Sequence, residues 1–242
     1  MYTKHRAKHS IRFDILTIFP HIFDSYFRAS ILKRAEERKL AAFHINSIRD
    51  FAADRHKTVD AKPYGGGAGM VMMALPILRA VSRVRKSYPR NAKVKTIILS
   101  AKGKQLTQAH AREWAKKYTH IILISGRYEG IDERVREVLR AEEISMGPYV
   151  VTDGDVAAMA VVSAVTRLIP GVIRLESLAE ESHWNQVLKE EGGGARLQEV
   201  EYPHYTRPEV FEWPPKRGKK YRVPRVLLSG DHKKIKEWRR QM

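Results

Sequence analysis

The densest group of chemically capable side chains lies between Asp50 and Met70. It includes Asp54-Arg55-His56 and, after a short gap, Pro63-Tyr64-Gly65-Gly66-Gly67. Glycines let a backbone approach a ligand closely, and their N–H groups can hold an anion or the edge of a base. The segment lacks the Lys-Ser/Thr of a phosphate-binding P-loop and the pattern of a dinucleotide motif. It indicates a ligand-contacting loop, with a plain flexible turn as the alternative.

A second group, Ser125 to Arg134, directly follows an apolar run and opens a helical pattern. Open α/β sheets bind ligands at the carboxyl ends of their strands. There, Gly126 gives space and Glu129 can accept hydrogen bonds from a ribose diol. The alternative is a structural turn in which Asp132 caps the next helix.

The third group runs from Met146 to Asp155, before a long apolar stretch. Its backbone can satisfy the edge of an adenine, or it can form an ordinary turn with Asp155 as the helix N-cap. Arg167 lies on the apolar stretch, where an unpaired charge is costly to bury. We therefore expect Arg167 to have a partner or a function.

The elements that must position these groups alternate along the chain. Short apolar, β-branched runs are followed by segments of helical periodicity, which predicts a mostly parallel sheet covered on both faces. The segment 49–69 loses periodicity, and 174–200 has the polar composition of a linker. The expected strands are 13–18, 42–48, 96–99, 120–124 and one near Ile144, and the expected helices are 21–39, 74–85, 106–117, 131–140 and 156–169.

The charge balance points to a polyanionic partner. The 242 residues include 45 Lys and Arg against 27 acidic residues, a net charge of +18, and nucleic acid fits this excess best. Residues 214–242 hold eleven of the basic residues against Asp231 and Glu237, a local +9 that is half of the excess. This concentration favours an RNA-facing tail over a dispersed, solvated surface.

Other features exclude whole classes of protein. There is no cysteine, which rules out disulfide frameworks, thiolate zinc sites and cysteine nucleophiles. The basic start, 1–9, is not followed by the apolar core of a secretory signal, so we expect a cytoplasmic protein. The longest apolar stretch, 156–165, is far shorter than the roughly 20 residues that span a bilayer, so no membrane span is expected.

Taken together, the motifs resemble those of the bacterial tRNA (guanine(37)-N1)-methyltransferases of the SPOUT class. The resemblance covers nearly all of residues 12–242. In chain order it rests on Phe19-Pro20, Arg49-Asp50-Phe51, Asp54-Arg55-His56, Val59-Asp60, Pro63-Tyr64-Gly65-Gly66-Gly67 with Gly69-Met70, the run from Gly126 to Arg134, Arg167 before Ile169-Pro170-Gly171-Val172, the run from Tyr202 to Val210, and Val223-Pro224 with the run from Val226 to Gly230.

The resemblance implies an α/β fold whose mostly parallel sheet carries a deep C-terminal trefoil knot, an exception to the rule against threaded chains. It implies a knotted S-adenosylmethionine-binding domain at 1–172, a mobile linker at 173–201 and a small, basic tRNA-binding region at 202–242 with a helix near 231–241. That last region is shorter than usual in the family, which commonly continues into further helices. The family works as a homodimer whose active sites take residues from both chains.

The resemblance also assigns roles by position. Arg167 would lie over the guanine O6, and the best match to the family's catalytic base is Glu181. The methyl-donor pocket would comprise Ile98, Leu99, Ser100, Gly126, Glu129, Met146, Gly147, Tyr149 and Gly154. The RNA would be bound by Asp54, Arg55, His56, Pro63, Tyr64, Gly65, Gly66, Ser182, Glu201, His204 and Arg207.

This sequence departs from the family at several positions. Glu181-Ser182-His183 stands in place of an Asp-Ser-Phe motif, with Glu180 and Glu176 as competing bases and a solvated acidic linker as the alternative. Asp153-Gly154-Asp155 stands where the family shows two glycines and a Glu. Some family members are helped by Mg²⁺, but no dedicated ligand cluster is visible here. Two alternatives therefore stay open: a methyltransferase with a shifted RNA target, and a relative that binds tRNA without turnover.

Overall fold

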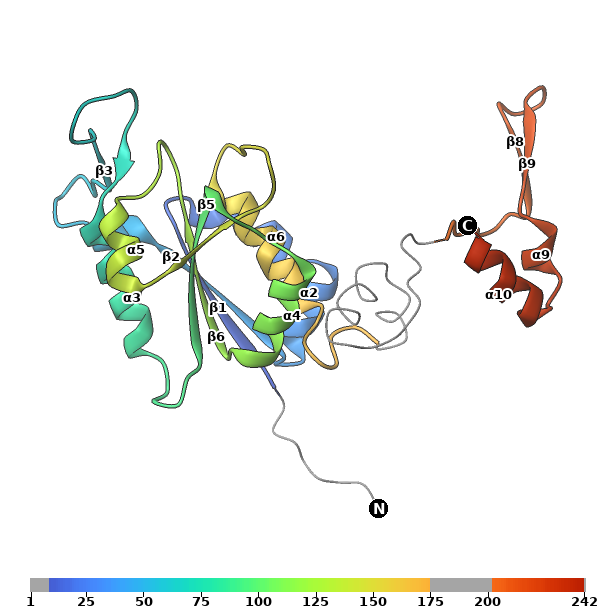
Figure 1. Ribbon diagram of the computed structural model, residues 1–242, viewed down its shortest axis with the longest axis horizontal. Coiled ribbons are helices and arrows are strands. Elements are labelled where there is room, and N and C mark those ends of the chain that lie inside the picture. The colour runs from blue at the N-terminus through green and yellow to red at the C-terminus, as the bar shows by residue number, and fades with distance from the viewer. Residues whose placement is uncertain (1–8, 175–201, 242) are drawn as a thin grey trace, which may run out of the picture. The chain divides into compact units, whose positions relative to one another are not determined.

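The computed structural model describes residues 9–174 and 202–241 (Figure 1). The chain divides into two compact units, Met1–Arg174 and Leu175–Met242. Each unit is considered by itself below. Among the described residues, no helix is long and apolar enough to cross a membrane.

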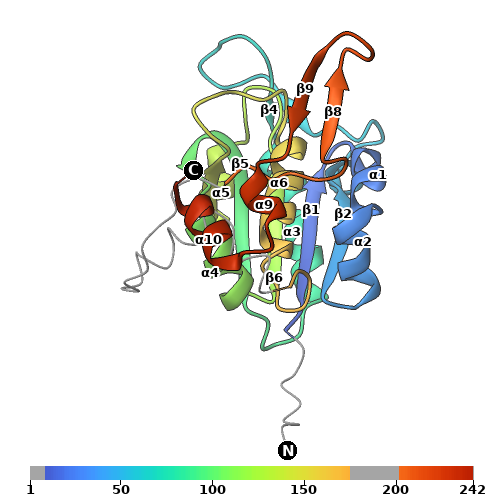
Figure 2. The same ribbon diagram turned by 90° about the vertical axis from the view of Figure 1, so that its right-hand side faces the viewer.

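The first unit is built on a five-stranded sheet with the strand order β2-β1-β6-β5-β7 (Figure 2). Every neighbouring pair in it is parallel, which confirms the expected α/β class. The trefoil knot stays a prediction. The strands are β1 (Ile11–Thr17), β2 (Ala41–Ser47), β5 (Val94–Gln105), β6 (His120–Ser125) and β7 (Glu142–Ser145).

Helices cover both faces of this sheet (Figure 1). The side chains of β6 alternate: Ile121 and Leu123 enter one buried core, whereas Ile122 and Ile124 enter the other. Burying each such side chain contributes about 1.5–3 kcal/mol, so both cores hold the sheet in place. The first core lies under α1 (Asp24–Phe27), α2 (Ser30–Glu37), α4 (Gln108–Lys117) and α6 (Gly154–Thr166), and the second under α3 (Ala74–Lys86) and α5 (Glu133–Leu139).

Two expected elements differ from the structure. The helix expected over 21–39 is divided into η1 (Pro20–Phe23), α1 and α2, because Ala29 is extended and Ser30 has a φ of +46°. The strand expected to end at 99 continues to Gln105. Both Leu99 and Lys104 pair with Ile144, so residues 100–103 bulge out of the sheet edge.

The aperiodic segment 49–69 has little regular structure. It begins in η2 (Ile48–Phe51), and β3 (Asp60–Ala61) pairs antiparallel with β4 (Val71–Met72). The glycine-rich residues 62–70 connect these two short strands. The segment is therefore a loop, as its composition predicts, and the pairing of β3 with β4 holds the two ends of its glycine-rich part together.

The second unit contains a hairpin and two helices: β8 (Val210–Trp213), β9 (Lys219–Arg222), α9 (Arg225–Leu228) and α10 (His232–Gln241). The helix expected near 231–241 is confirmed. The structure adds an antiparallel pair of strands within 210–222, which was not predicted from the sequence. Its strands carry many charges and lack the apolar alternation that signals a strand in sequence.

Candidate active site

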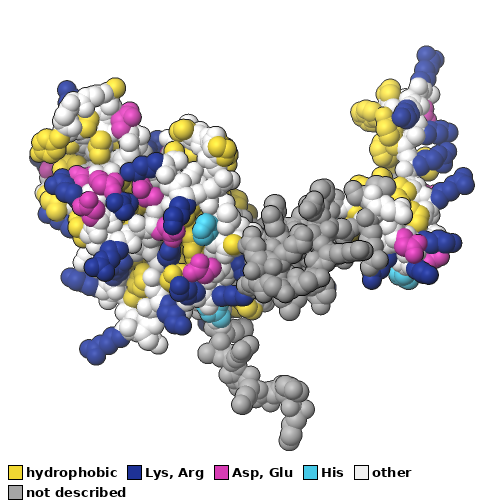
Figure 3. All heavy atoms as spheres, in the orientation of Figure 1, with side chains coloured by type: hydrophobic (Ala, Val, Ile, Leu, Met, Phe, Trp, Pro, Cys, Tyr) yellow, Lys and Arg dark blue, Asp and Glu magenta, His cyan; other side chains and the backbone are white. Residues whose placement is uncertain are grey.

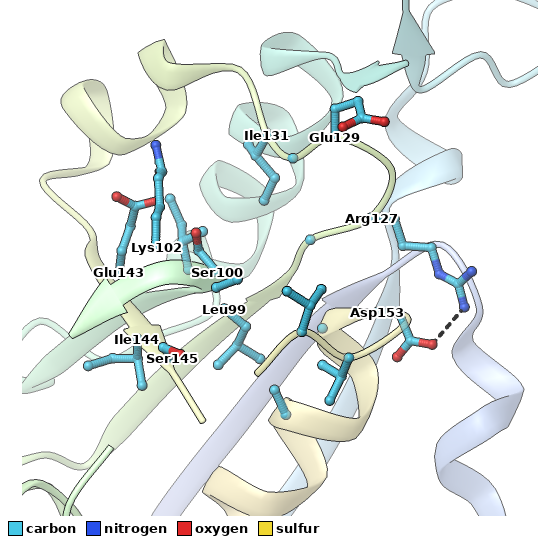
Figure 4. Close-up of a pocket in the computed structure, with 18 of the residues that line it drawn as sticks. Leu99, Ser100, Lys102, Arg127, Glu129, Ile131, Glu143, Ile144, Ser145 and Asp153 are labelled. Atoms are coloured by element: carbon cyan, nitrogen blue, oxygen red, sulfur yellow. Dashed lines mark hydrogen bonds and ion pairs between the residues drawn. The ribbon is translucent and has the colours of Figure 1, made fainter. Parts of the chain in front are cut away.

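A cavity of about 370 Å³ lies beside the bulge of β5, where β6 and β7 end (Figure 4). Its walls come from the β5 bulge, the loop after β6, and the loop between β7 and α6. This is the edge at which parallel α/β sheets bind ligands. The cavity is lined by eight of the nine residues assigned to the donor pocket from the sequence: Ile98, Leu99, Ser100, Gly126, Glu129, Met146, Tyr149 and Gly154.

Gly147, the ninth, does not line the cavity. A Cβ at Gly147 would lie 2.6 Å from the ring of Tyr149, so the glycine makes room for that ring. The Ser145 hydroxyl donates to the Gly147 carbonyl at 3.0 Å and fixes the turn. Gly147 therefore does not line the cavity itself but leaves space for the Tyr149 ring, which does.

The loops after β6 and β7 meet closely beside the cavity. The amide of Gly154 donates to the carbonyl of Gly126 at 2.9 Å. A Cβ at Gly154 would lie 2.7 Å from the Gly126 nitrogen, and one at Gly126 would lie 3.0 Å from the Leu99 carbonyl oxygen. Because glycine has no Cβ, these positions let the backbones of β5, the loop after β6 and the start of α6 lie in direct contact.

An ion pair strengthens the same junction. Arg127 Nη2 lies 3.0 Å from Asp153 Oδ2, and the guanidinium also lies over the ring of Phe19, 4.4 Å from its centroid. Figure 4 shows this pair at one end of the cavity and Lys102 with Glu143 at the other. Sequence reasoning missed Arg127, because an arginine inside a glycine motif gives no sign of its partner.

Asp153 is also the N-cap of α6. Its Oδ1 accepts hydrogen bonds from the amides of Asp155, at 2.9 Å, and Val156, at 3.2 Å. The interpretation of Asp155 as the cap was therefore wrong. Asp155 is fully buried instead, and neither of its carboxylate oxygens has a hydrogen-bond partner among the described residues.

The glycine-rich loop joins the Gly126–Gly130 turn. Met72 donates to the carbonyl of Gly130 at 2.9 Å, and Glu129 donates to that of Met70 at 3.0 Å. A Cβ at Gly69, whose φ is +79°, would lie 2.4 Å from Glu129 Oε1. The first two sequence groups are thus neighbours in space, and Gly69 leaves the space that the Glu129 carboxylate occupies.

The residues assigned to RNA binding in this unit mostly point outward. The Tyr64 side chain is 99% exposed, and open space surrounds Gly65 and Gly66. Arg55, His56 and the partly exposed Pro63 lie on the same segment.

Asp54 shapes the turn that carries Arg55 and His56. It accepts the Thr58 hydroxyl at 2.8 Å, the Thr58 amide at 2.9 Å and the His56 amide at 3.2 Å. The hydrogen bond from the Thr58 hydroxyl is the main cause that lowers the pKa of Asp54. An anionic Asp54 therefore positions its neighbours through the backbone.

Arg167 lies apart from the cavity in its own chain. It follows the last residue of α6, whereas Gly154 begins that helix and lines the cavity. Thirteen steps of α-helix separate the two residues by roughly 20 Å. His204 and Arg207 belong to the second unit, and Glu181, Ser182 and Glu201 lie outside the described residues.

The remaining charged groups of the cavity are paired. Lys102 Nζ lies 3.1 Å from Glu133 and 3.4 Å from Glu143, and the bond to Glu133 is the main cause that raises its pKa. Asp132 caps α5, as expected, by accepting the amide of Arg134 at 3.0 Å. Within 9–174 and 202–241, no group of three or more His, Asp or Glu is arranged to hold a metal ion.

A parallel sheet with a glycine-walled cavity and a carboxylate at the strand ends places the chain in the class of α/β proteins whose site geometry is typical of binding nucleotide-like small molecules. Comparison with known proteins narrows this class. The family model described as tRNA (Guanine-1)-methyltransferase TrmD matches residues 11–242. The chain belongs to this family, as the sequence motifs indicate.

Three relatives show how much of the chain the match covers. Each is a curated tRNA (guanine-N(1)-)-methyltransferase. The protein of Thermomicrobium roseum is 49% identical over 96% of this chain and 78% of its own length. The protein of Chloroflexus aggregans is 48% identical over 95% of this chain and 82% of its own length. The protein of Carboxydothermus hydrogenoformans is 46% identical over 96% of this chain and 82% of its own length.

Proposed function

We propose that this chain transfers the methyl group of S-adenosylmethionine to N1 of guanosine 37, next to the anticodon of tRNA, in the cytoplasm. The observation that carries the proposal is the cavity beside the β5 bulge and the ends of β6 and β7, whose lining includes eight of the nine residues expected for the donor. Family membership supports the same reaction. Residues 1–172 would bind the donor, and the basic region at 202–242 would bind tRNA.

The residues of the cavity fit the donor chemically. Ile98, Leu99 and Ile144 offer apolar walls to an adenine, and Glu129 can accept hydrogen bonds from a ribose. The donor carries a sulfonium cation. Five acidic residues line the cavity against three basic ones, a net −2 within a chain of +18: Glu129, Asp132, Glu133, Glu143 and Asp153 against Lys102, Arg127 and Arg136. This local reversal of charge favours a cationic ligand.

The catalytic task of the protein is to manage charge on the guanine. N1 of guanine holds a proton at neutral pH, so a base must remove it while negative charge grows toward O6, and a carboxylate suits this task. Glu181 is assigned as that base. Arg167 offers several N–H donors to O6 and stays cationic throughout. When bound, S-adenosylmethionine would supply the electrophilic methyl group and leave as S-adenosylhomocysteine, and the cavity residues would hold it for reaction with a guanosine flipped out of its loop.

In this proposal the enzyme is a homodimer with composite active sites. Arg167 lies roughly 20 Å along α6 from the cavity of its own chain, too far to act on a base placed there. A second copy can supply the arginine. Ile22 of η1, Tyr26 of α1 and Val156 of α6 each expose between 40% and 50% of their surface, and exposed apolar side chains of this kind suit contact between copies.

The test uses purified protein, labelled donor and two tRNA transcripts, one with guanosine at position 37 after a guanosine and one with adenosine at 37. Label on the first alone supports the proposal, and no label on either contradicts it. Mapping the methylated nucleotide by mass spectrometry distinguishes a shifted RNA target. Adding EDTA to the same reaction measures any help from Mg²⁺.

The base is tested separately with Glu181→Gln, Glu180→Gln and Glu176→Gln. We expect the first to remove most of kcat, by about 10²- to 10⁴-fold, with RNA affinity retained. A similar loss in one of the other two variants, and not in Glu181→Gln, would move the role to that residue. If kcat survives in all three, the base lies elsewhere.

A further inference from the structure

We propose that one face of the β8–β9 hairpin is a stacking platform for unpaired nucleotides of RNA. The inference rests on the proposed tRNA methyltransferase function only for which RNA is bound. It concerns residues 210–222 of the second unit. None of these residues is among those assigned to the donor or the guanine.

The register of the hairpin places three aromatic side chains on one face. Phe211 pairs with Tyr221, and Trp213 pairs with Lys219. Directly paired residues of antiparallel strands share a face, and so do residues two apart on one strand. Phe211, Trp213, Tyr221 and Lys219 therefore project on the same side, with Glu212, Lys220, Val210 and Arg222 on the other.

These rings are exposed although they are large. Phe211 is 51% exposed, Trp213 65% and Tyr221 44%. The rings of Phe211 and Tyr221 stack with centroids 5.3 Å apart and planes 20° from parallel, and Lys219 Nζ lies 5.6 Å from the Tyr221 centroid. The face thus already presents flat π-surfaces with a cation beside them.

The charges of the hairpin favour an anionic ligand. Between 210 and 222 there are five Lys or Arg and one acid, Glu212, a local +4: Lys216, Arg217, Lys219, Lys220 and Arg222. The Glu212 carboxylate accepts the Gly218 amide at 3.0 Å and so serves the turn. Among the described residues, none of the five cations forms an ion pair. Figure 3 shows hydrophobic side chains along one side of this hairpin and Lys and Arg along the other.

RNA suits this surface better than a protein partner does. Lysine is depleted from the cores of protein interfaces, because its charge must be desolvated. Aromatic rings flanked by cations are the arrangement by which proteins hold single-stranded nucleic acid, with the rings under the bases and the cations on the phosphates. A duplex offers no unstacked base to such a face.

The experiment measures tRNA affinity of the full-length protein without donor, over a series of salt concentrations. Trp213→Leu and Phe211→Leu keep an apolar side chain but remove the π-surface. We expect each to weaken binding roughly tenfold without changing the slope of log K against log salt. Lys219→Ala should instead lower that slope by about 0.7, as expected for a lost contact to single-stranded RNA.

Leu228→Ala is the matched control, because it removes an exposed apolar side chain, 49% accessible, from α9 of the same unit. It should bind tRNA like the parent protein. Competition adds a second measure: an unstructured twelve-nucleotide oligoadenylate should displace tRNA from the parent better than a matched RNA duplex does. In Trp213→Leu the oligoadenylate should lose most of its advantage over the duplex in displacing tRNA.

Unchanged affinity in both leucine variants would overturn the platform. So would a shift in oligomeric state or melting temperature in place of a loss of RNA affinity, since that result would assign the face to protein contact. The parent's methylation assay is read independently. A parent that binds tRNA through this face but methylates no transcript refutes the proposed function and leaves the platform standing.

Discussion

Arg127 and Asp153 are 26 positions apart in sequence, yet their side chains meet at 3.0 Å beside the cavity. Asp153 serves two partners at once, because its other oxygen caps α6. Asp153→Asn keeps an oxygen for the cap and removes the charge, so we expect a loss of less than about 1 kcal/mol in unfolding free energy. Asp153→Ala also removes the cap and should cost about 1–2 kcal/mol more.

Donor affinity, measured by calorimetry, should fall in both variants, because the loop between β7 and α6 forms one wall. For the stability measurement Thr152→Ala is a suitable control, since the Thr152 hydroxyl lies 3.2 Å from Asp153 Oδ2, whereas the N-cap of α6 is Asp153. Equal stability of Asp153→Ala and the parent would refute the capping role.

Gly69→Ala should lower donor affinity by displacing the Glu129 carboxylate. The added Cβ would lie 2.4 Å from Glu129 Oε1 in a backbone with a φ of +79°. Gly65→Ala is the matched control, because its φ is +85° and nothing lies within 4 Å of the added atom. Both variants carry similar backbone strain, so a difference in donor Kd isolates the contact with Glu129. Equal donor affinity in the two would remove Glu129 from the donor site.

Mixing two inactive variants tests the composite site. Glu129→Ala damages the donor cavity of its own chain, and Arg167→Ala removes the arginine that its chain would supply to the partner's cavity. If Arg167 acts on the partner's cavity, a mixed dimer therefore retains one intact site. Random reassembly should restore about a quarter of the parent activity. Arg167→Ala mixed with Arg167→Gln should restore none. Failure of the first mixture, despite proven subunit exchange, would place Arg167 and the cavity in one chain or remove Arg167 from catalysis.

Tyr88 should make stability fall at high pH. Its hydroxyl donates to the fully buried Asp14 at 2.7 Å. Burial, with the neighbouring Asp14 charge, raises the pKa of Tyr88 well above its ordinary value. The stability this provides is fully present below about pH 10, where tyrosine in the unfolded chain titrates, and is lost as pH rises toward the folded pKa.

Tyr88→Phe should cost about 1–3 kcal/mol at pH 7, because a buried carboxylate loses a donor. It should also flatten the decline above pH 10, where the parent loses up to about 1.4 kcal/mol per pH unit from this group. Chemical unfolding at pH 7, 10 and 11 measures both effects. Tyr26→Phe, at a 40% exposed position, should change neither.

Local patterns explain why most elements of the first unit could be predicted. Strand 120–124 is apolar on both faces because helices cover both sides of β6, and the structure extends it only to Ser125. The prediction of one continuous helix over 21–39 was wrong, because the helix is broken at Ser30 by a backbone turn that hydrophobic periodicity does not reveal. The β8–β9 hairpin was not predicted, since its strands are largely exposed and have no buried face that would leave an apolar pattern in the sequence.

The three glycine-bearing groups, and through them the family and eight residues that line the cavity, could be predicted from the sequence itself. Their residue types are imposed by backbone geometry within a few positions, which sequence records directly. The ion pair of Arg127 with Asp153, the space that Gly69 leaves for Glu129, and the distance of Arg167 from its own cavity were decided only by the tertiary structure. They depend on which distant segments the parallel sheet brings to one edge, and that order is set by the packing of the whole domain.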